Sequence, residues 1–435
     1  MYLENEKYAL PEEVLLRIFS EADSKELRKL LGINNYWRLL LIKNPVIMRK
    51  LPLILQGNNW KDKLEFVECY GKYIREIIFT NTEMDSVDEI REILKETPKL
   101  EKLTFENIKL PKIEAEIVNV NVNEVRMDYY QHPRDNEVER IEVVPVLIEK
   151  IHLPALKYLS IKDDNETNIL SDFKNNFIVH LHSFSFELKS EEQLNDFEEF
   201  LVEQHTMKSL NIISGDEMIF TSSDELLERI KFKLTKLEIT AGLMRHNPNF
   251  IKFLIAQKDK LTDFLLHIEH IDFRYHNFIF THLNSLEVLL FDIDTLATTE
   301  SLKSLKKFKP NKNLKTLRLV GKNHHLNIFD AVINIFPKLQ QLHIDNLKAF
   351  YGDQIKTLCY LEDLKIDQLN RKCLEFNEIP SLKKLELNRV TESFSHEMYE
   401  KNLMNNFTQF SFGNKEIEKH NHIHQNQDFA FIAVS

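Results

Sequence analysis

The chain has 435 residues, a formal net charge of −11 at pH 7, 8 glycines and 12 prolines. The length fits two or three ordinary domains, or one repeat array with a small additional unit, and the scarcity of glycine and proline argues against a long flexible linker. The acidic balance argues against general nucleic-acid binding, which needs a basic face, although it leaves room for a local basic patch.

Residues 1–45 predict a unit of three short helices. The first helix opens at Pro11, whose missing N–H costs nothing at that position. It carries an apolar stripe at helical spacing, formed by Val14, Leu15, Ile18 and Phe19. A second helix is predicted to begin near Ser24, because Asp23-Ser24-Lys25-Glu26 has the capping-box pattern with Asp in the first position.

A third helix is predicted from about Asn35 to Lys43. The second and third helices together direct six apolar side chains inward: Leu27, Leu30, Leu31, Trp37, Leu40 and Leu41. A unit of roughly 40 residues rarely buries enough apolar surface to be stable alone. We therefore expect another surface to cover part of it.

This segment resembles the F-box, which docks on the Skp adaptor of cullin-RING ubiquitin ligases. The residues that carry the resemblance are Leu10-Pro11-Glu12-Glu13, the Ile18-Phe19 pair, Leu27 and Trp37. A Leu-Trp pair shortly after the third helix is absent, and the next tryptophan is Trp60. The resemblance implies that these residues contact or support the adaptor: Leu10, Pro11, Ile18, Phe19, Leu27, Leu30 and Trp37. The alternative is a helical cap, in which Leu27 and Trp37 belong to the core of the unit.

Residues 74–412 contain a repeated Leu-x-x-Leu-x-Leu-type pattern with 14 starts, 21 to 34 residues apart. The starts are Ile74, Leu100, Val122, Leu156, Leu181, Met207, Leu234, Leu261, Leu286, Leu314, Leu339, Leu361, Leu382 and Phe407. Most intervals fall within the period of leucine-rich repeats. The pattern predicts an α/β fold, a horseshoe-shaped leucine-rich-repeat solenoid with a parallel inner sheet and outer helices.

Two features of the repeats refine this prediction. Prolines stand two residues before the first anchor at four places, Pro98, Pro154, Pro337 and Pro380, where they end a helix and favour an extended chain. Apolar residues replace the Asn that usually follows eight positions after the anchor, at Ile108, Leu347, Leu369 and Val390. We therefore do not expect an asparagine ladder to hold the turns.

Four parts are predicted along the chain: the F-box-like unit at 1–45, a helical linker or N-terminal cap at 46–73, the solenoid at 74–412, and a C-terminal tail or cap at 413–435. Residues 128–155 contain a polar insertion, interpreted as an exposed loop, with a partner-contacting role as the alternative. The apolar residues 429–434 suggest a cap that adds a strand to the last repeat.

The inner face of the predicted sheet is the second candidate surface, because solenoids commonly bind partners there. Counting from the anchors gives the polar set Arg126, Tyr158, Lys236, Glu238, Asp263, His267, Arg318, His343 and Asp367. It also gives an apolar set, Leu265, Val288 and Leu290, near Lys236 and Arg318. Exposed apolar residues beside cations indicate a binding hot spot. The alternative is a local register slip that places Leu265 inside and Leu266 outside.

Motifs for catalysis or cofactors are not found. The sequence lacks a Gly-rich phosphate loop, a His-Glu-x-x-His and a paired Cys-x-x-Cys. Of its three cysteines, Cys69, Cys359 and Cys373, the last two are interpreted as small core residues. The tail histidines His420, His422 and His424 could touch a metal, but a solvated polar tail is the favoured interpretation. We expect no cofactor and no resident metal.

The sequence therefore predicts a non-catalytic protein. The resemblance implies the substrate-recognition subunit of an SCF-type ligase, which binds the Skp adaptor, and through it the cullin, and an unidentified protein substrate. The alternative is a leucine-rich-repeat scaffold or inhibitor outside any ligase. With few cysteines and no export signal or transmembrane stretch, we expect a cytoplasmic or nuclear protein, monomeric within its complex, that binds neither nucleic acid nor membrane.

Overall fold

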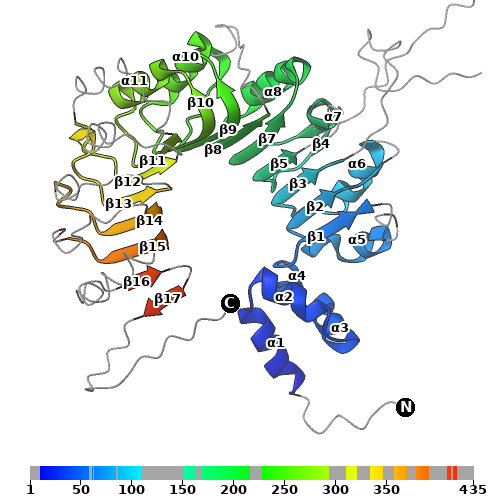
Figure 1. Ribbon diagram of the computed structural model, residues 1–435. Coiled ribbons are helices and arrows are strands. Elements are labelled where there is room, and N and C mark those ends of the chain that lie inside the picture. Colours follow the sequence, from blue (N-terminus) through cyan, green and yellow to red (C-terminus); the bar gives the residue numbers. More distant parts are fainter. Residues whose placement is uncertain are drawn as a thin grey trace, which may run out of the picture. The chain divides into compact units, whose positions relative to one another are not determined.

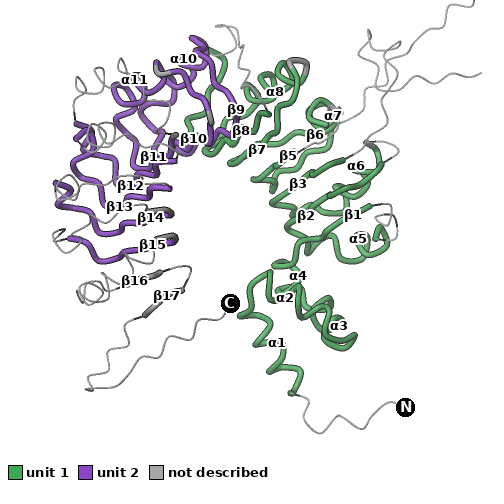
Figure 2. Tube along the Cα trace, viewed as in Figure 1, with its two compact units in different colours: residues 1–215, 219–234 green, residues 216–218, 235–435 purple. Residues whose placement is uncertain are grey.

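The computed structural model describes residues 10–57, 61, 63–84, 87–108, 150–162, 169–215, 228–292, 310–320, 334–345, 357–369, 379, 381–390, 409–412 and 415–418. They belong to two compact units, distinguished in Figure 2. Unit 1 comprises residues 1–215 and 219–234, and unit 2 comprises residues 216–218 and 235–435.

Unit 1 begins with four helices, α1 (Glu12–Glu21), α2 (Ser24–Leu31), α3 (Asn35–Lys43) and α4 (Pro45–Met48) (Figure 1). The predicted capping box is present, since the Asp23 carboxylate accepts from the Glu26 N–H and the Glu26 carboxylate accepts from the Asp23 N–H. Asn34 caps α3 by accepting from the Trp37 N–H. The helices share a core formed by Leu15, Phe19, Leu27, Leu40, Leu41, Ile47, Met48 and Leu51. The three predicted helices are thus confirmed, and α4 is an addition.

The sheet strands of unit 1 are β1 (Leu53–Gln56), β2 (Glu76–Thr80), β3 (Lys102–Glu106), β5 (Tyr158–Lys162), β7 (Ser183–Leu188) and β8 (Ser209–Ser214). Each pairs with the next in parallel. Between them lie α5 (Leu64–Tyr70), the 3-10 helix η3 (Gly71–Tyr73), α6 (Val87–Lys95), α7 (Ile169–Asn176) and α8 (Glu191–Glu203). A separate parallel pair joins β4 (Ile151–His152) to β6 (Phe177–Ile178).

Residues 46–73, expected to form a helical linker or N-terminal cap, contain α5, η3 and most of α4. They also contain β1, which was not predicted and which pairs with β2 from Leu53 opposite Ile77 to Gln56 opposite Thr80. The sheet therefore begins one strand before the first repeat anchor at Ile74. The anchor at Val122 and most of the predicted insertion lie outside the described residues.

The sheet strands of unit 2 are β9 (Lys236–Met244), β10 (Asp263–Ile271), β11 (Val288–Asp292), β12 (Thr316–Val320), β13 (Gln341–Ile344), β14 (Asp363–Leu369), β15 (Lys384–Val390), β16 (Gln409–Phe412) and β17 (Lys415–Glu418). Neighbours pair in parallel up to β16, and β17 pairs antiparallel to β16. Helix α10 (Pro248–Gln257) follows β9 and α11 (Phe273–His282) follows β10.

The alternation of side chains along each strand explains the fold. In β3, Leu103 and Phe105 are fully buried, and their register partners in β2 are Ile77 and Phe79. Phe79 and Phe105 stack with ring centroids 5.2 Å apart. Each buried aliphatic or aromatic anchor contributes about 1.5–3 kcal/mol relative to an exposed one. The α/β leucine-rich-repeat solenoid predicted from the sequence is therefore confirmed.

A recurring set of main-chain hydrogen bonds joins successive repeats just before each strand. The Arg75 carbonyl accepts from the N–H groups of both Glu101 and Lys102, at 2.8 and 2.9 Å. The same double acceptance recurs at the carbonyls of Glu101, Lys157, His182, Thr235, Thr262, Glu287, Lys315, Gln340 and Glu362. We call this series the main-chain relay. It ties adjacent repeats without requiring a particular side chain.

At the far ends of β2 and β3, a short asparagine pair supplements the relay. Asn81 and Asn107 both have positive φ, 49° and 53°, which asparagine tolerates better than most residues. The Asn107 Nδ2 donates to the Asn81 Oδ1 at 2.6 Å. Our expectation of no asparagine ladder thus needs correction for these two repeats, where the asparagine lies seven positions after the anchor rather than eight.

Candidate protein-binding surfaces

Helix α1 exposes one apolar line of side chains while burying another. Leu10, Val14 and Ile18 are 49%, 42% and 48% exposed. The spacing of four residues places Val14 and Ile18 on one side of the helix, and Leu10 lies two residues before its start at Glu12. Leu15 and Phe19 enter the core of the unit. We call Leu10, Val14 and Ile18 the α1 apolar line. Large exposed aliphatic residues grouped on and just before one short helix are typical of a protein-contact site.

A second group of exposed apolar residues lies at and before α3. Ile33, Tyr36 and Leu39 are each roughly half exposed. Tyr36 and Leu39 immediately precede Trp37 and Leu40, which pack on or in the core. Only the core-facing residues of α3 were predicted from the sequence, and Tyr36 and Leu39 were not among them, although their three-residue spacing places them on one side of the helix.

The residues that the F-box resemblance implies divide into three groups. Leu10, Pro11 and Ile18 are exposed and available for contact. Leu30 and Trp37 are partly buried and pack against the core. Phe19 and Leu27 are fully buried, so the prediction that they contact an adaptor directly was wrong. Their burial fits only the other predicted role, in which they support the residues that make the contact.

The predicted inner-face residues occupy both units. In unit 1, Tyr158 is exposed on β5, whereas Arg126 lies outside the described residues. In unit 2, the Lys236 Nζ pairs with the Glu238 Oε2 at 2.9 Å, and the His267 Nε2 lies 3.7 Å from the other oxygen of Glu238. Lys236, Glu238 and His267 therefore form one polar group across β9 and β10.

The predicted apolar patch is smaller than expected. Leu265 and Val288 are partly exposed, but Leu290 is only 4% exposed, so its prediction as a solvent-facing residue was wrong. In the sheet register Leu290 lies between Leu265 and Arg318, and side chains on strands about 4.8 Å apart cover a residue between them. Leu266 is buried, which excludes the alternative register for β10.

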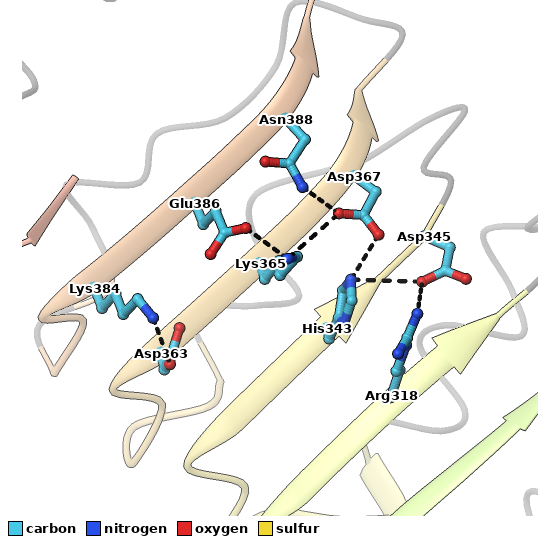
Figure 3. Close-up of polar contacts among 9 residues, drawn as sticks. All are labelled: Arg318, His343, Asp345, Asp363, Lys365, Asp367, Lys384, Glu386 and Asn388. Atoms are coloured by element: carbon cyan, nitrogen blue, oxygen red, sulfur yellow. Dashed lines mark hydrogen bonds and ion pairs between the residues drawn. The ribbon is translucent and has the colours of Figure 1, made fainter. Parts of the chain in front are cut away.

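A polar network covers the inner side of β12 to β15 (Figure 3). The His343 Nε2 lies 2.8 Å from the Asp367 Oδ2 and 3.5 Å from the Asp345 Oδ1. The Arg318 Nη2 lies 3.4 Å from the same oxygen of Asp345. On β14 and β15, Lys365 pairs with Glu386, Asp363 pairs with Lys384, and Asn388 donates to Asp367.

Two carboxyl groups of this network have shifted pKa values in opposite directions. Partial burial raises the pKa of Asp363 above its ordinary value, and the charge of Lys384 offsets part of that effect. Partial burial acts in the same direction on Asp367, but hydrogen bonds from His343 and Asn388 outweigh it, so the pKa of Asp367 is lowered. Asp367 is thus held as a carboxylate by its neighbours.

The predictions about the cysteines, the histidines of the tail and membrane-spanning helices remain. Cys359 is exposed, so its interpretation as a core residue was wrong, while Cys373 and the histidines of the tail lie outside the described residues. Among the residues that the structure describes, no helix is long and apolar enough to cross a membrane. What the described surfaces offer is contact area: apolar side chains on the helical unit and paired charges on the inner face.

Comparisons with known proteins give only distant similarities. No protein-family model matches the chain, and no curated protein matches it. An internalin from Listeria monocytogenes is similar in structure, with 11% identity and a TM-score of 0.33 over 92% of this chain and 87% of that one. The yeast complex of Rad7 and Elc1 gives 14% identity and a TM-score of 0.38 over 88% and 90%. The complex of TLR13 with ssRNA13 gives 14% and 0.38 over 89% and 60%. Such weak similarities say nothing of what this chain binds.

Proposed function

We propose that this chain is a substrate-recognition subunit of an SCF-type ubiquitin ligase, docking on a Skp adaptor through its helical unit. The observation that carries the proposal is the α1 apolar line. The helical unit already has a closed core of its own, including Phe19 and Leu27, so Leu10, Val14 and Ile18 are not needed to complete it. Their exposure next to the Leu-Pro-x-Glu opening supports a docking role.

The inner face of unit 2 is the proposed substrate surface. It offers the partly exposed Leu265 and Val288 beside Lys236 and His267. In unit 1, the exposed Tyr158 is a separate candidate contact. An apolar centre with a charged rim is the usual anatomy of a protein interface. The chain acts by holding a bound protein near a conjugating enzyme supplied by the complex, which raises the effective concentration and asks no chemistry of its own residues. We expect it in the cytoplasm or nucleus, as a monomer within that complex.

The test is co-purification of the full chain with the Skp adaptor and its cullin. Ile18→Asp and Val14→Asp place a charge in the α1 apolar line and are expected to abolish co-purification while the thermal melt is retained. Ser24→Asp is the matched control, because it adds the same residue at an exposed position of α2 where a negative charge favours the helix. Undiminished binding by both α1 variants would sink the adaptor assignment.

The second candidate function is a binding scaffold or inhibitor outside any ligase. The inner face serves it equally well, since a fold does not by itself determine function. The same experiment separates the two: a full chain that is folded and soluble yet captures neither adaptor nor cullin supports the scaffold. Capture of the adaptor by the wild-type chain alone supports the ligase subunit.

A further inference from the structure

Three potential metal ligands converge on the inner side of unit 2, at β13 and β14 (Figure 3). The His343 ring nitrogen, one oxygen of Asp345 and one oxygen of Asp367 all lie within 4.8 Å of one another. We propose that His343, Asp345 and Asp367 bind a divalent first-row transition-metal ion, with Zn²⁺ as the ion to test. The proposal is independent of the ligase assignment.

Two of the three distances between ligand atoms suit such an ion with little movement, and the third, between the two carboxylate oxygens, is within 4.8 Å. A tetrahedral Zn²⁺ with bonds of about 2.0–2.1 Å holds its ligand atoms roughly 3.3 Å apart. The His343 Nε2 and the Asp345 Oδ1 are already 3.5 Å apart. The His343 Nε2 and the Asp367 Oδ2, now 2.8 Å apart, need to separate by about 0.5 Å, which a small side-chain rotation supplies.

The strand register gives an independent reason for a cation here. Ile344 pairs with Ile366. Asp345, directly after the end of β13, and Asp367 on β14 are the next residues and face the same side. Like charges at neighbouring positions of a sheet are unfavourable. Without a metal, His343, Arg318 and Lys365 supply the positive charge that offsets this repulsion. A divalent ion between the two carboxylates supplies the same positive charge while using His343 as a ligand.

Neighbouring side chains already orient the ligands. The Asn388 Nδ2 donates to the Asp367 Oδ1, which leaves the Oδ2 facing His343. Hydrogen bonds of this kind fix the direction of a ligating carboxylate. Arg318 does the opposite, because its Nη2 approaches the same Asp345 oxygen that the metal needs. Arg318 therefore competes with the ion, and its removal is expected to strengthen metal binding.

The ligand set selects the class of ion. Imidazole nitrogen with two carboxylate oxygens suits Zn²⁺ and its first-row neighbours, whereas Ca²⁺ and Mg²⁺ prefer oxygen ligands throughout. Three protein ligands leave a fourth position for water, as in open zinc sites.

The experiment titrates the full chain with Co²⁺, followed by visible absorption, and with Zn²⁺, followed by calorimetry. All variants carry Gln in place of His420, His422 and His424, so that the tail cannot supply the signal. We expect one equivalent of ion with tetrahedral Co²⁺ bands, a loss of at least 100-fold in affinity in His343→Gln and Asp367→Asn, and a gain in Arg318→Met. Asp363→Asn, a carboxylate on the same strand that pairs with Lys384, is the matched control and should bind normally.

Circular dichroism of each variant confirms that the fold is retained. Binding that His343→Gln and Asp367→Asn leave unchanged overturns the proposal, as does the absence of binding at millimolar ion. In either case the cluster is an ion-pair network only.

Discussion

The indole ring of Trp37 meets the phenyl ring of Phe19 edge to face, with centroids 5.2 Å apart and planes at 61°. Such aromatic pairs contribute about 0.5–1.5 kcal/mol beyond their buried area. The contact joins α1 to α3 inside the helical unit. A change at Trp37 therefore disturbs the fold of the unit itself, and the α1 apolar line is the better place to test adaptor binding.

Adjacent residues of α1 are expected to respond very differently to truncation. Phe19→Ala removes a fully buried ring and its contact with Trp37, and should cost roughly 3–5 kcal/mol of unfolding free energy. Ile18→Ala, at an exposed position, should stay within about 0.5 kcal/mol. Hydrogen exchange of α1 to α3, with chemical denaturation, measures both. Equal costs would contradict the described burial of α1.

Gly71 is expected to reject any side chain. It lies at the start of η3, and a Cβ built there would be 2.3 Å from the main-chain oxygen of Glu96. Since backbone cannot rotate away as a side chain does, Gly71→Ala should destabilise by roughly 1–3 kcal/mol. Gly215, whose added Cβ would meet nothing within 4 Å, is the matched control and should be neutral or slightly stabilised. Thermal melts compare the two.

The register of β10 is testable with neighbouring leucines. Leu266 is buried and Leu265 is partly exposed on the inner side. Leu266→Ala should cost roughly 2–5 kcal/mol, and Leu265→Ala less than half as much. Denaturant unfolding of the full chain gives both values. A larger loss of unfolding free energy in Leu265→Ala than in Leu266→Ala would instead support the alternative register, in which Leu265 is buried and Leu266 is exposed.

The contribution of Asp272 to the stability of the fold is expected to depend on pH. Its carboxylate caps α11 by accepting from the Arg274 N–H at 2.9 Å, and it also accepts from the Arg274 guanidinium at 2.6 Å. The hydrogen bond from Arg274 outweighs partial burial and lowers the pKa of Asp272 below 3.8. A carboxyl group whose folded pKa is lowered stabilises the fold above its unfolded pKa and loses that effect as pH falls through the folded pKa.

Asp272→Asn keeps the capping oxygen but removes the charge, so it isolates the ionic part of this contact. Wild type should melt at a higher temperature than the variant at pH 7, and the gap should close as the pH is lowered toward 3. Melting curves at pH 7, 5, 4 and 3 check this. A gap that stays constant would mean that the charge of Asp272 does not contribute.

The sequence was sufficient to predict helices and strands wherever a local residue pattern determines them. Anchors two residues apart, such as Leu103 and Phe105, identify a strand and its buried side at once. The capping box at Asp23 locates the start of α2 to the residue. β1 escaped prediction because Leu53–Gln56 stands before the first complete repeat, where no earlier period exists to match it against.

The inner face was harder to predict, for a different reason. Alternation says which side a residue faces, but its exposure depends on the neighbouring strands, some 25 residues away in sequence. Leu290 lies on the inner side of the sheet as expected, but it is buried because Leu265 and Arg318 flank it on the neighbouring strands. The contact of His343 with Asp367 is diagonal, because the residue opposite His343 is Lys365. Aligning the anchors gives the opposite residue but does not say which diagonal neighbours meet.

The main-chain relay has a mechanical consequence. Within each unit, successive repeats are joined by bonds of the same kind and nearly the same length, from the Arg75 carbonyl to that of Glu362. Each joint of a series carries the whole tensile load, and relay bonds of nearly equal length resist it about equally. Along the relay, strain therefore spreads over the repeats of a unit instead of gathering at one joint.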